Sequence, residues 1–542
     1  MIRRLYQKVR PYLWLTPGFL LWASYPPMGE VCDVFFALAP LIWLSRTATV
    51  RMTVRRWFLN GFLFWIATLY WMPAIVKNGG PWPLVVLGWF ALAAYCSLFF
   101  AAYGWLSATY WHHVGRRSAV GRVCGVLLVE PVLWCGLELL RSRLFGGFAW
   151  NQLGVVSVAC GFGAPARLGG VYLCSAVVFL VNGSIAGILE RMYASLRNWF
   201  ERKPSDSAST RWRTFETLAI FLVVWGIYAA SRPGRDADGS RSESLTVGLV
   251  QRNFPCVFRA QEEDPLSVYR SLAGQLSHAK PDLVVLSESA LCEFGAVDSP
   301  SARAFAADLL SITGARGMLA GGGRSADGCE YNSAALYTPP SPVDARRLAG
   351  LAGVYDKVHL VPFGEYIPGD KFVPALQKLA PVGSCTPGVC RLVELSGAEG
   401  RSDVRLGVAI CFEDTDSALM RKFASKGANA LVFITNDSWF SYSIESVQHA
   451  WQATARAIET GLPVVRVGNS GVSGTIDPNG RTSWLIGPDG APLVDARGAM
   501  CDRIVLGNGT TPYVKYGDVP LFSFFLLLIT TLFMIKYTHR YE

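Results

Sequence analysis

Long apolar runs occupy the first 231 residues of the chain and return once near its end. Several exceed the roughly 20 residues that a helix needs to cross a bilayer, and they carry few charges. Pro17, Pro26 and Pro27 make the first run the weakest candidate. The pattern predicts about eight membrane-spanning helices, over residues 12–28, 31–45, 57–75, 83–111, 123–140, 168–189, 214–231 and 519–535.

The pattern changes between residues 232 and 516. Here apolar runs of four to seven residues alternate with Gly, Pro, Asn and Asp, which is typical of strands joined by turns. We therefore expect three parts: a transmembrane bundle of about seven helices over 1–231, a water-soluble α/β domain over 232–516, and a last transmembrane helix with a short tail over 517–542.

Basic residues predict the orientation of these helices. Lys and Arg gather at alternate ends of the apolar runs, and basic loops stay in the cytoplasm. Both termini are then cytoplasmic and the soluble domain lies on the other side, with Arg141 and Arg143 as exceptions. The net charge of +10 follows from this distribution. A nucleic-acid partner is not expected, since the soluble domain has no clustered basic face. The basic groups are residues 3, 4, 8 and 10; 46, 51, 55 and 56; 116, 117 and 122; and 191, 197, 202, 203, 211 and 213.

The thirteen cysteines give no sign of a metal centre. Six lie in or beside apolar runs, where Cys is usually a small apolar residue. Cys385 and Cys390 flank a Thr-Pro-Gly-Val turn, and the sequence leaves open whether they form a disulfide. The chain has no C-x-x-C and no H-E-x-x-H motif, so we expect neither a metal nor a cofactor.

Reactive side chains follow several of the predicted strands. "VRLGVAICFED" (404–414) runs from an apolar strand into Cys411, and "PDLVVLSES" (281–289) runs into Glu288. "YDKVHLVPFGEYIP" (355–368) carries Lys357 and Glu365 in a loop. In α/β sheets functional groups gather beyond the carboxyl ends of strands, so these side chains are expected to meet.

A thiol, a carboxylate and an ammonium together can perform acyl transfer. Cys411 needs a neighbouring base or cation to attack an ester carbonyl, because the free thiol has a pKa of about 8.5. Glu288 can take and return the proton if burial raises its pKa, and Lys357 with a backbone N–H after Cys411 can stabilise the oxyanion. Glu365 can hold Lys357. Taken singly, each residue is also consistent with an ordinary buried thiol or a solvated surface charge.

These segments resemble the nitrilase (carbon-nitrogen hydrolase) superfamily, which has a Glu-Lys-Cys triad on an α-β-β-α sandwich. "LTVGLVQRNFP" (245–255) and "YNSAAL" (331–336) also fit its pattern. With the membrane helices, the whole chain is similar to the bacterial apolipoprotein N-acyltransferase family. The segments most specific to that family are "KVHLVPFGEYIP" (357–368), "ICFED" (410–414), "NDSWF" (436–440) and "TPYVKYGD" (511–518), and "ELLRSRLFGGFAW" (138–150) fits more loosely.

The resemblance implies a two-step reaction at the inner (cytoplasmic) membrane, in a multi-pass protein whose catalytic domain is periplasmic. A phospholipid donates an acyl chain to a cysteine thioester, and the α-amino group of a diacylglyceryl apolipoprotein then accepts it. Glu288, Lys357 and Cys411 correspond to the catalytic triad, with Glu365, Glu413 and Phe412 in supporting positions. Asn436, Trp439 and Phe440 correspond to a lipid-binding loop.

Some positions differ from the family pattern or allow another interpretation. Leu286-Ser287 precede Glu288 where the family usually has Trp-Pro, and Phe412 replaces the usual Tyr. Glu130, inside an apolar run, is either functional or simply neutralised within the bundle. Two other functions remain possible alternatives: a membrane-tethered amidase or nitrilase acting on a small C–N substrate, and a non-enzymatic membrane protein with a relic domain.

Overall fold

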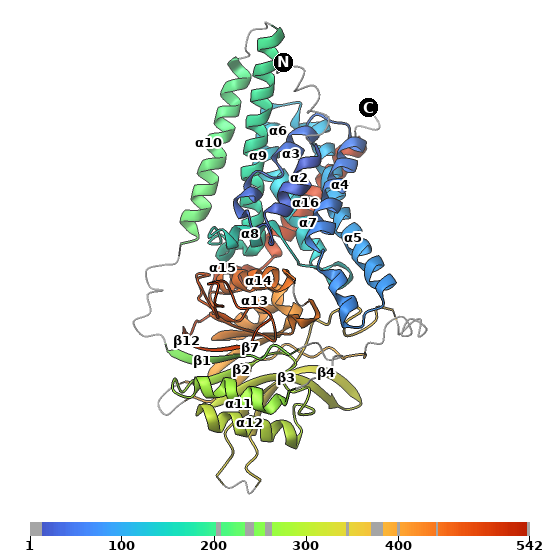
Figure 1. The fold of residues 1–542 in the computed structure, drawn as a ribbon. Coiled ribbons are helices and arrows are strands. Elements are labelled where there is room, and N and C mark those ends of the chain that lie inside the picture. Colours follow the sequence, from blue (N-terminus) through green and yellow to red (C-terminus); the bar gives the residue numbers. More distant parts are fainter. Residues whose placement is uncertain are drawn as a thin grey trace. The chain divides into compact units, whose positions relative to one another are not determined.

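The chain forms two compact units in the computed structural model, which describes residues 14–201, 207–232, 243–254, 263–342, 346–369, 383–397, 402–440 and 443–538. The helical unit comprises Met1–Tyr70, Val86–Arg232 and Tyr516–Glu542. The α/β unit comprises Trp71–Val85 and Pro233–Lys515. Each unit is described by itself below (Figure 1).

Helices make up the described part of the first unit. In chain order they are α2 (Thr16–Ala23), η2 (Val31–Phe35), α3 (Ala39–Ser45), α4 (Val50–Thr68), α5 (Trp82–Tyr110), η4 (Trp111–Gly115), α6 (Ala119–Cys124), η5 (Gly125–Val129), α7 (Glu130–Arg141), η6 (Leu144–Gly146), α8 (Leu153–Ala159), α9 (Ala166–Glu201), α10 (Ser207–Ala230) and α16 (Val519–Thr538). Helix α5 begins in the second unit.

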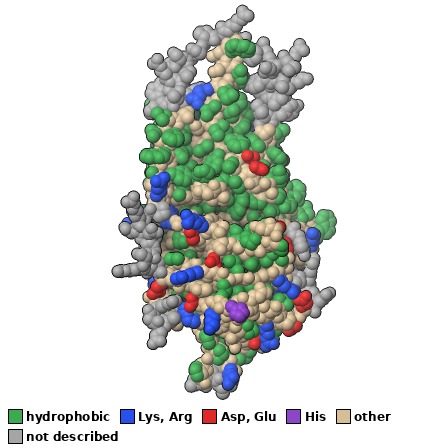
Figure 2. Space-filling model, turned by 60° about the vertical axis from the view of Figure 1, so that its left-hand side comes forward, with side chains coloured by type: hydrophobic (Ala, Val, Ile, Leu, Met, Phe, Trp, Pro, Cys, Tyr) green, Lys and Arg blue, Asp and Glu red, His purple; other side chains and the backbone are tan. Residues whose placement is uncertain are grey.

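Five helical segments in the described ranges are long and apolar enough to cross a membrane: Val50–Asn78, Trp82–Gly115, Ala119–Arg141, Ala166–Trp199 and Val519–Lys536. Val31–Ser45 and Thr217–Ala230 are shorter apolar helices. These seven segments correspond to seven of the eight apolar runs, so a helical membrane unit is confirmed, while eight crossings remain a prediction. Hydrophobic side chains cover most of the visible surface of this unit (Figure 2), as lipid-facing helices require.

The structure accounts for Glu130 and revises the prediction for Arg46. Both side chains are buried, and their charged atoms lie 2.8 Å apart. Glu130 also accepts a hydrogen bond from Trp111 Nε1 at 2.8 Å. An isolated carboxylate in an apolar bundle would be costly, and the guanidinium of Arg46 neutralises Glu130. Arg46 is therefore part of a buried ion pair and not a free charge in a loop. The structure therefore favours the interpretation of Glu130 as paired within the bundle.

Arg141 and Arg143, the two exceptions to the charge pattern, also have partners. Arg141 is buried and donates to the carbonyl oxygens of Phe148 and Trp150 at 2.7 and 2.9 Å, which holds the 142–150 segment against α7. Arg143 lies 2.8 Å from Asp518. These contacts give both residues a structural role at this end of α7.

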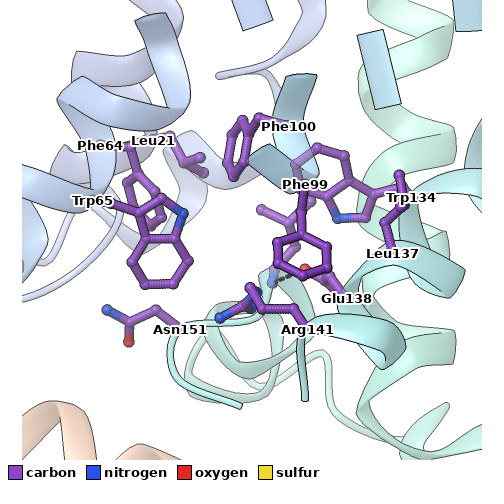
Figure 3. A pocket seen from close by; sticks show the side chains of 11 residues that line it. Leu21, Phe64, Trp65, Phe99, Phe100, Trp134, Leu137, Glu138, Arg141 and Asn151 are labelled. Atoms are coloured by element: carbon purple, nitrogen blue, oxygen red, sulfur yellow. Dashed lines mark hydrogen bonds between the residues drawn. The ribbon is translucent and has the colours of Figure 1, made fainter. Parts of the chain in front are cut away.

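A small cavity lies beside Arg141 (Figure 3). Aromatic and aliphatic side chains form most of its wall, and Glu138, Arg141 and Asn151 form a polar end. Glu138 accepts a hydrogen bond from the backbone N–H of Leu153 at 3.0 Å. The cavity is lined by Leu21, Phe64, Trp65, Phe99, Phe100, Trp134, Leu137, Glu138, Arg141, Asn151 and Leu153.

The described strands of the second unit form two six-stranded sheets. Its strands are β1 (Ser244–Gln251), β2 (Leu283–Leu286), β3 (Gly317–Ala326), β4 (Cys329–Thr338), β5 (Gly350–Asp356), β6 (Val393–Leu395), β7 (Val404–Ile410), β8 (Ala430–Thr435), β9 (Val464–Gly468), β10 (Gly474–Ile476), β11 (Thr482–Trp484) and β12 (Gly498–Val505). The strand orders are β12-β1-β2-β3-β4-β5 and β11-β10-β9-β8-β7-β6.

Helices cover the outer face of each sheet. Helices α11 (Pro265–Leu276) and α12 (Pro300–Thr313) share one apolar core with the first sheet. Helices α13 (Ser417–Ser425) and α14 (Glu445–Thr460) pack on the second sheet. One apolar core takes side chains from strands of both sheets and from these two helices. The result is the α-β-β-α sandwich expected from the sequence, visible in the lower part of Figure 1. The described residues of this unit also form the short helices η9 (Cys411–Thr415), η10 (Asp437–Phe440) and α15 (Pro512–Tyr516).

The connection between α4 and α5 belongs to this second unit, which the sequence did not predict. It contains the 3₁₀ helix η3 (Met72–Asn78). The Asn78 amide donates to the carbonyl oxygens of Ser438 and Trp439 at 3.2 and 2.7 Å, and the Trp71 ring lies edge-on to Phe440 with the ring centres 4.7 Å apart. A segment between two apolar helices therefore braces the loop that follows β8.

Candidate active site

Strand direction brings the predicted catalytic side chains to one edge of the α/β unit. In the first sheet β2 and β3 are parallel, and β4 is antiparallel to both β3 and β5. The carboxyl ends of β2 and β5 therefore lie at the same edge, as does the start of β4. Glu288 follows β2, and Lys357 directly follows β5. In the second sheet Cys411 directly follows β7.

Lys357 sits among acceptors on its own sheet edge. Its Nζ lies 3.0 Å from Glu365 and 3.9 Å from Glu288 Oε1. The side-chain amide of Asn332, on β4, donates to Glu288 at 2.8 Å and to Glu365 at 2.7 Å. Asn332 thus holds the two carboxylates on either side of one ammonium. The sequence pattern around Asn332, "YNSAAL", predicts no such role for its side chain.

The surroundings set the protonation of these groups. Burial raises the pKa of Glu288, although Lys357 opposes the rise. Burial alone would lower the pKa of Lys357, but the charges of Glu365, Cys411 and Glu288 outweigh it and raise that pKa above its usual value. Lys357 is therefore a permanent cation at physiological pH, and Glu288 is a carboxylate with increased affinity for a proton.

Cys411 occupies a strained position at the start of η9, directly after β7. Its φ of 55° is unusual for a residue with a Cβ, and such strain, about 1–3 kcal/mol, is typical of functional positions. Burial raises the pKa of its thiol well above the usual value, and the charge of Glu288 adds to the rise while Lys357 opposes it. The resting side chain is consequently a neutral thiol, so it needs a base before it can attack.

Glu413 ties the Cys411 turn to the Lys357 loop. It is fully buried and accepts hydrogen bonds from the backbone N–H groups of Ile410, Val358 and His359, at 2.8, 2.7 and 2.9 Å. The Tyr355 hydroxyl donates to it at 2.9 Å. Burial raises the pKa of Glu413 to about 6, although Lys357 and the backbone donors favour the carboxylate. One carboxylate therefore fixes the backbone on both sides of the site.

The three loop residues predicted to bind lipid lie in different surroundings. The Asn436 amide donates to Ser289 Oγ at 2.9 Å and its oxygen accepts from Asn469 at 3.0 Å, so this side chain braces the loop. Trp439 and Phe440 are partly exposed. Phe412, next to the thiol, is partly exposed and its ring lies 5.9 Å from the ring of His359.

A buried group of charged residues lies behind this loop, and three of its members have the spacing of metal ligands. Ligand atoms of Asp437, Glu445 and His449 lie within 4.8 Å of one another. Arg466, however, approaches Asp437 to 3.2 Å and Asp414 to 2.7 Å. A guanidinium at that distance already supplies the positive charge that a metal ion would bring, so we interpret the group as an ion-pair network.

Known proteins match both parts of the chain. The family model of the apolipoprotein N-acyltransferase N-terminal domain matches residues 17–184, and that of carbon-nitrogen hydrolase matches residues 248–503. The chain is 30% identical to the apolipoprotein N-acyltransferase of Geobacter metallireducens, over 94% of this chain and 92% of that protein. Identity to the Pasteurella multocida protein of the same name is 25%, over 97% and 96%. A carbon-nitrogen hydrolase structure from Helicobacter pylori matches 51% of this chain and 94% of its own, with 19% identity and a TM-score of 0.35.

The fold and the matched domains define the class of protein: a carbon-nitrogen hydrolase domain joined to membrane helices. The agreement with the curated relatives over nearly the whole chain is more specific. The chain belongs to the apolipoprotein N-acyltransferase family, and it is therefore an acyltransferase.

Proposed function

We propose that Cys411 is the nucleophile that carries the acyl chain, with Glu288 as general base and Lys357 as oxyanion partner. The main support is that Glu288, Asn332, Glu365 and Lys357 contact one another at one sheet edge. In addition, the charges of Glu288 and Lys357 act on the pKa of the Cys411 thiol. Each group is in the protonation state that its role requires.

In the first step the Cys411 sulfur attacks the ester carbonyl of a phospholipid. Glu288 takes the thiol proton as the S–C bond forms. The negative charge passes to the carbonyl oxygen, where Lys357 and a backbone N–H after Cys411 stabilise it. When the ester C–O bond breaks, the leaving oxygen takes the proton back from Glu288. The products are a thioester and a lysophospholipid.

In the second step the α-amino group of a diacylglyceryl-cysteine acceptor attacks the thioester. Glu288 accepts a proton from the attacking nitrogen, and the same donors stabilise the second tetrahedral intermediate. Collapse breaks the C–S bond, and the departing sulfur is protonated by Glu288. The lipoprotein leaves as an amide, and Cys411 returns to the thiol state.

Glu365 and Glu413 would position this machinery. Glu365 accepts from the backbone N–H of Val361 at 2.8 Å while it pairs with Lys357, so it fixes the ammonium to its loop. Glu413 joins the loop after β5 to the turn after β7. Asn436 would hold the Trp439–Phe440 loop, whose partly exposed rings offer apolar contacts to an acyl chain.

We further propose that the protein lies in the bacterial inner membrane with both termini in the cytoplasm and the catalytic unit on the periplasmic side. The alternating basic segments support this orientation. A small-molecule amidase is not favoured, since the whole chain, membrane helices included, matches N-acyltransferases.

Conversion of a synthetic diacylglyceryl-cysteinyl peptide tests the assignment. Purified protein in detergent with phospholipid should form the N-acyl peptide, while Cys411→Ser and Glu288→Gln should reduce its formation by at least about 10³-fold. Cys501→Ser, a thiol on β12, is the matched control and should keep wild-type rates. Product formation by Cys411→Ser at the wild-type rate would refute the assignment.

A further inference from the structure

The buried charges behind the site connect its two most important loops. Asp414 lies three residues after Cys411, in η9, and Asp437 begins η10, which contains Trp439 and Phe440. His449, on α14, lies between them: its Nε2 is 2.9 Å from Asp414 Oδ1 and its Nδ1 is 3.1 Å from Asp437 Oδ1. One imidazole thus contacts the carboxylates of both loops.

Two further charged residues complete the network. Arg466, on β9, contacts Asp414 at 2.7 Å and Asp437 at 3.2 Å. Glu445, one turn before His449 on α14, lies 3.6 Å from His449 Nδ1. The five residues are all less than a tenth exposed, with Asp414 and Arg466 fully buried. Charges in such a place must balance, because water cannot screen them.

The protonation states give a neutral network. Burial alone would lower the pKa of His449, but Asp414 and Asp437 outweigh it and raise the pKa to about 10, so the imidazole is a cation at neutral pH. Burial and the charge of Asp437 raise the pKa of Glu445 to about 8, so this carboxyl is mostly protonated. Two cations, His449 and Arg466, then face two anions, Asp414 and Asp437.

Asp437 also acts on the catalytic residues. Its charge contributes to the raised pKa of the Cys411 thiol, together with burial and Glu288. It also contributes, as a smaller cause, to the raised pKa of Glu288. If His449 were neutral, the unbalanced charge of Asp437 would oppose formation of the thiolate more strongly. The cations paired with Asp437 therefore make Cys411 easier to ionise.

We propose that His449 is a positioning residue for the acyl transfer: its imidazolium balances Asp437 and ties the nucleophile turn to the Trp439–Phe440 loop. The role depends on the assignment of Cys411 as the nucleophile. It predicts that the charge of this network, set by residues that touch no substrate, controls the ionisation of the thiol.

Opposite charge changes provide the test. His449→Gln removes a cation and leaves the network with one excess negative charge. Asp437→Asn removes an anion and leaves one excess positive charge. The double variant restores neutrality. Alkylation of the full-length protein by iodoacetamide is followed through the Cys411 peptide by mass spectrometry at pH 7, where Glu445 is mostly protonated and His449 is charged. The rate reports the ionisation of the thiol, because only the thiolate reacts appreciably.

We expect His449→Gln to slow alkylation at pH 7 by about three- to tenfold, Asp437→Asn to accelerate it by a similar factor, and the double variant to lie between them. These factors correspond to pKa changes of about half to one unit. Gln452→Leu, a buried neutral side chain one turn along α14, is the control for packing damage and should keep the wild-type rate. Loosened packing would expose the thiol and speed alkylation in every variant, so it cannot produce shifts of opposite sign.

Two outcomes would overturn the inference: equal alkylation rates in wild type and Asp437→Asn, or a change in the same direction for both single variants. If His449→Gln does not fold, Asp437→Asn is compared with the packing control Gln452→Leu: acceleration in Asp437→Asn with a wild-type rate in Gln452→Leu supports the proposal, and an unchanged or slower rate in Asp437→Asn contradicts it. Thioester formation from phospholipid is measured separately in the wild type. Its absence would refute the proposed reaction and leave the alkylation result intact.

Discussion

Replacing Asn332 by Leu would test how the site controls its general base. The Asn332 amide donates to Glu288 Oε1 at 2.8 Å and to Glu365 Oε1 at 2.7 Å. The first of these hydrogen bonds favours the ionised carboxylate and so lowers the pKa of Glu288, against the raising effect of burial. Leu has a similar size and shape but no donor, so the pKa of Glu288 should rise further in the variant.

The structure sets the size of this effect. A hydrogen bond to a charged group contributes about 1.5–3 kcal/mol, and 1.4 kcal/mol corresponds to about one pKa unit. The Glu288 side chain is 11% exposed, so water can replace part of the lost bond. We therefore expect a rise of about one unit. Glu288 must be ionised to accept the thiol proton, so on the acidic side of the profile thioester formation should slow about tenfold.

The assay is the initial rate of Cys411 acylation by phospholipid, measured by peptide mass spectrometry on samples quenched between pH 5 and 9. The acidic limb of the wild-type profile should move to higher pH in Asn332→Leu. Asn429→Leu is the control, since Asn429 accepts a hydrogen bond from the backbone of Arg405 and has no catalytic carboxylate partner. A folded Asn332→Leu protein whose acidic limb stays in place, or moves to lower pH, would refute the reasoning.

Three further predictions concern the scaffold of the site. A Cβ on Gly471 would collide with the carboxylate of Asp437, so Gly471→Ala should lower the free energy of unfolding by about 1–3 kcal/mol. A Cβ on Gly323 would meet no atom, so Gly323→Ala should leave it unchanged. Thermal unfolding of both variants in detergent checks this. Burial raises the pKa of Glu413 from 4.5 to about 6. The folded protein therefore gains stability from the protonated carboxyl below about pH 4.5 and loses it as the pH rises through 6. In thermal unfolding, the stability advantage of wild type over Glu413→Gln should shrink by about 2 kcal/mol between pH 4.5 and 7. Asn78→Ala removes two hydrogen bonds to loop carbonyls, each of about 1 kcal/mol, so acylation should slow by up to about thirtyfold at limiting phospholipid while alkylation of the thiol is unchanged. An unaltered acylation rate would show that this brace does not matter.

The sequence predicts residues whose place follows from the strand pattern. Lys357 and Cys411 come directly after the strands β5 and β7, and Glu288 comes two residues after β2. Because a strand end fixes where the next side chain lies, the apolar runs alone indicated which residues would gather at the edges of the sheets. The resemblance to a known superfamily then gave these residues their expected roles.

The sequence does not predict contacts between distant segments. Asn332 is a polar residue in the middle of a strand motif, and only the pairing of β4 with its neighbours shows that its amide reaches two carboxylates. The connection containing Asn78 follows an apolar helix, so its sequence gives no sign that it packs with the α/β unit. His449 lies on α14, and only the fold shows that it is buried between two acids, whose charges keep its imidazole protonated.

The boundaries of the apolar helices were also predicted imperfectly. The apolar pattern predicts the third helix over 57–75, whereas α4 covers Val50–Thr68 and so includes Arg51, Arg55 and Arg56. Long basic side chains can extend along a helix to the lipid headgroups, so such residues do not mark the end of a helix. Hydropathy locates this helix but misses about its first two turns.

The intact mass of the protein after mixing with a phospholipid of defined acyl chain tests the central claim most directly. The account predicts that wild type gains the mass of one acyl group, on the Cys411 peptide, and loses it when a diacylglyceryl-cysteinyl peptide is added, as the N-acyl peptide appears at the same rate. An acyl group on another residue, or peptide acylation without a preceding adduct on Cys411, would contradict it.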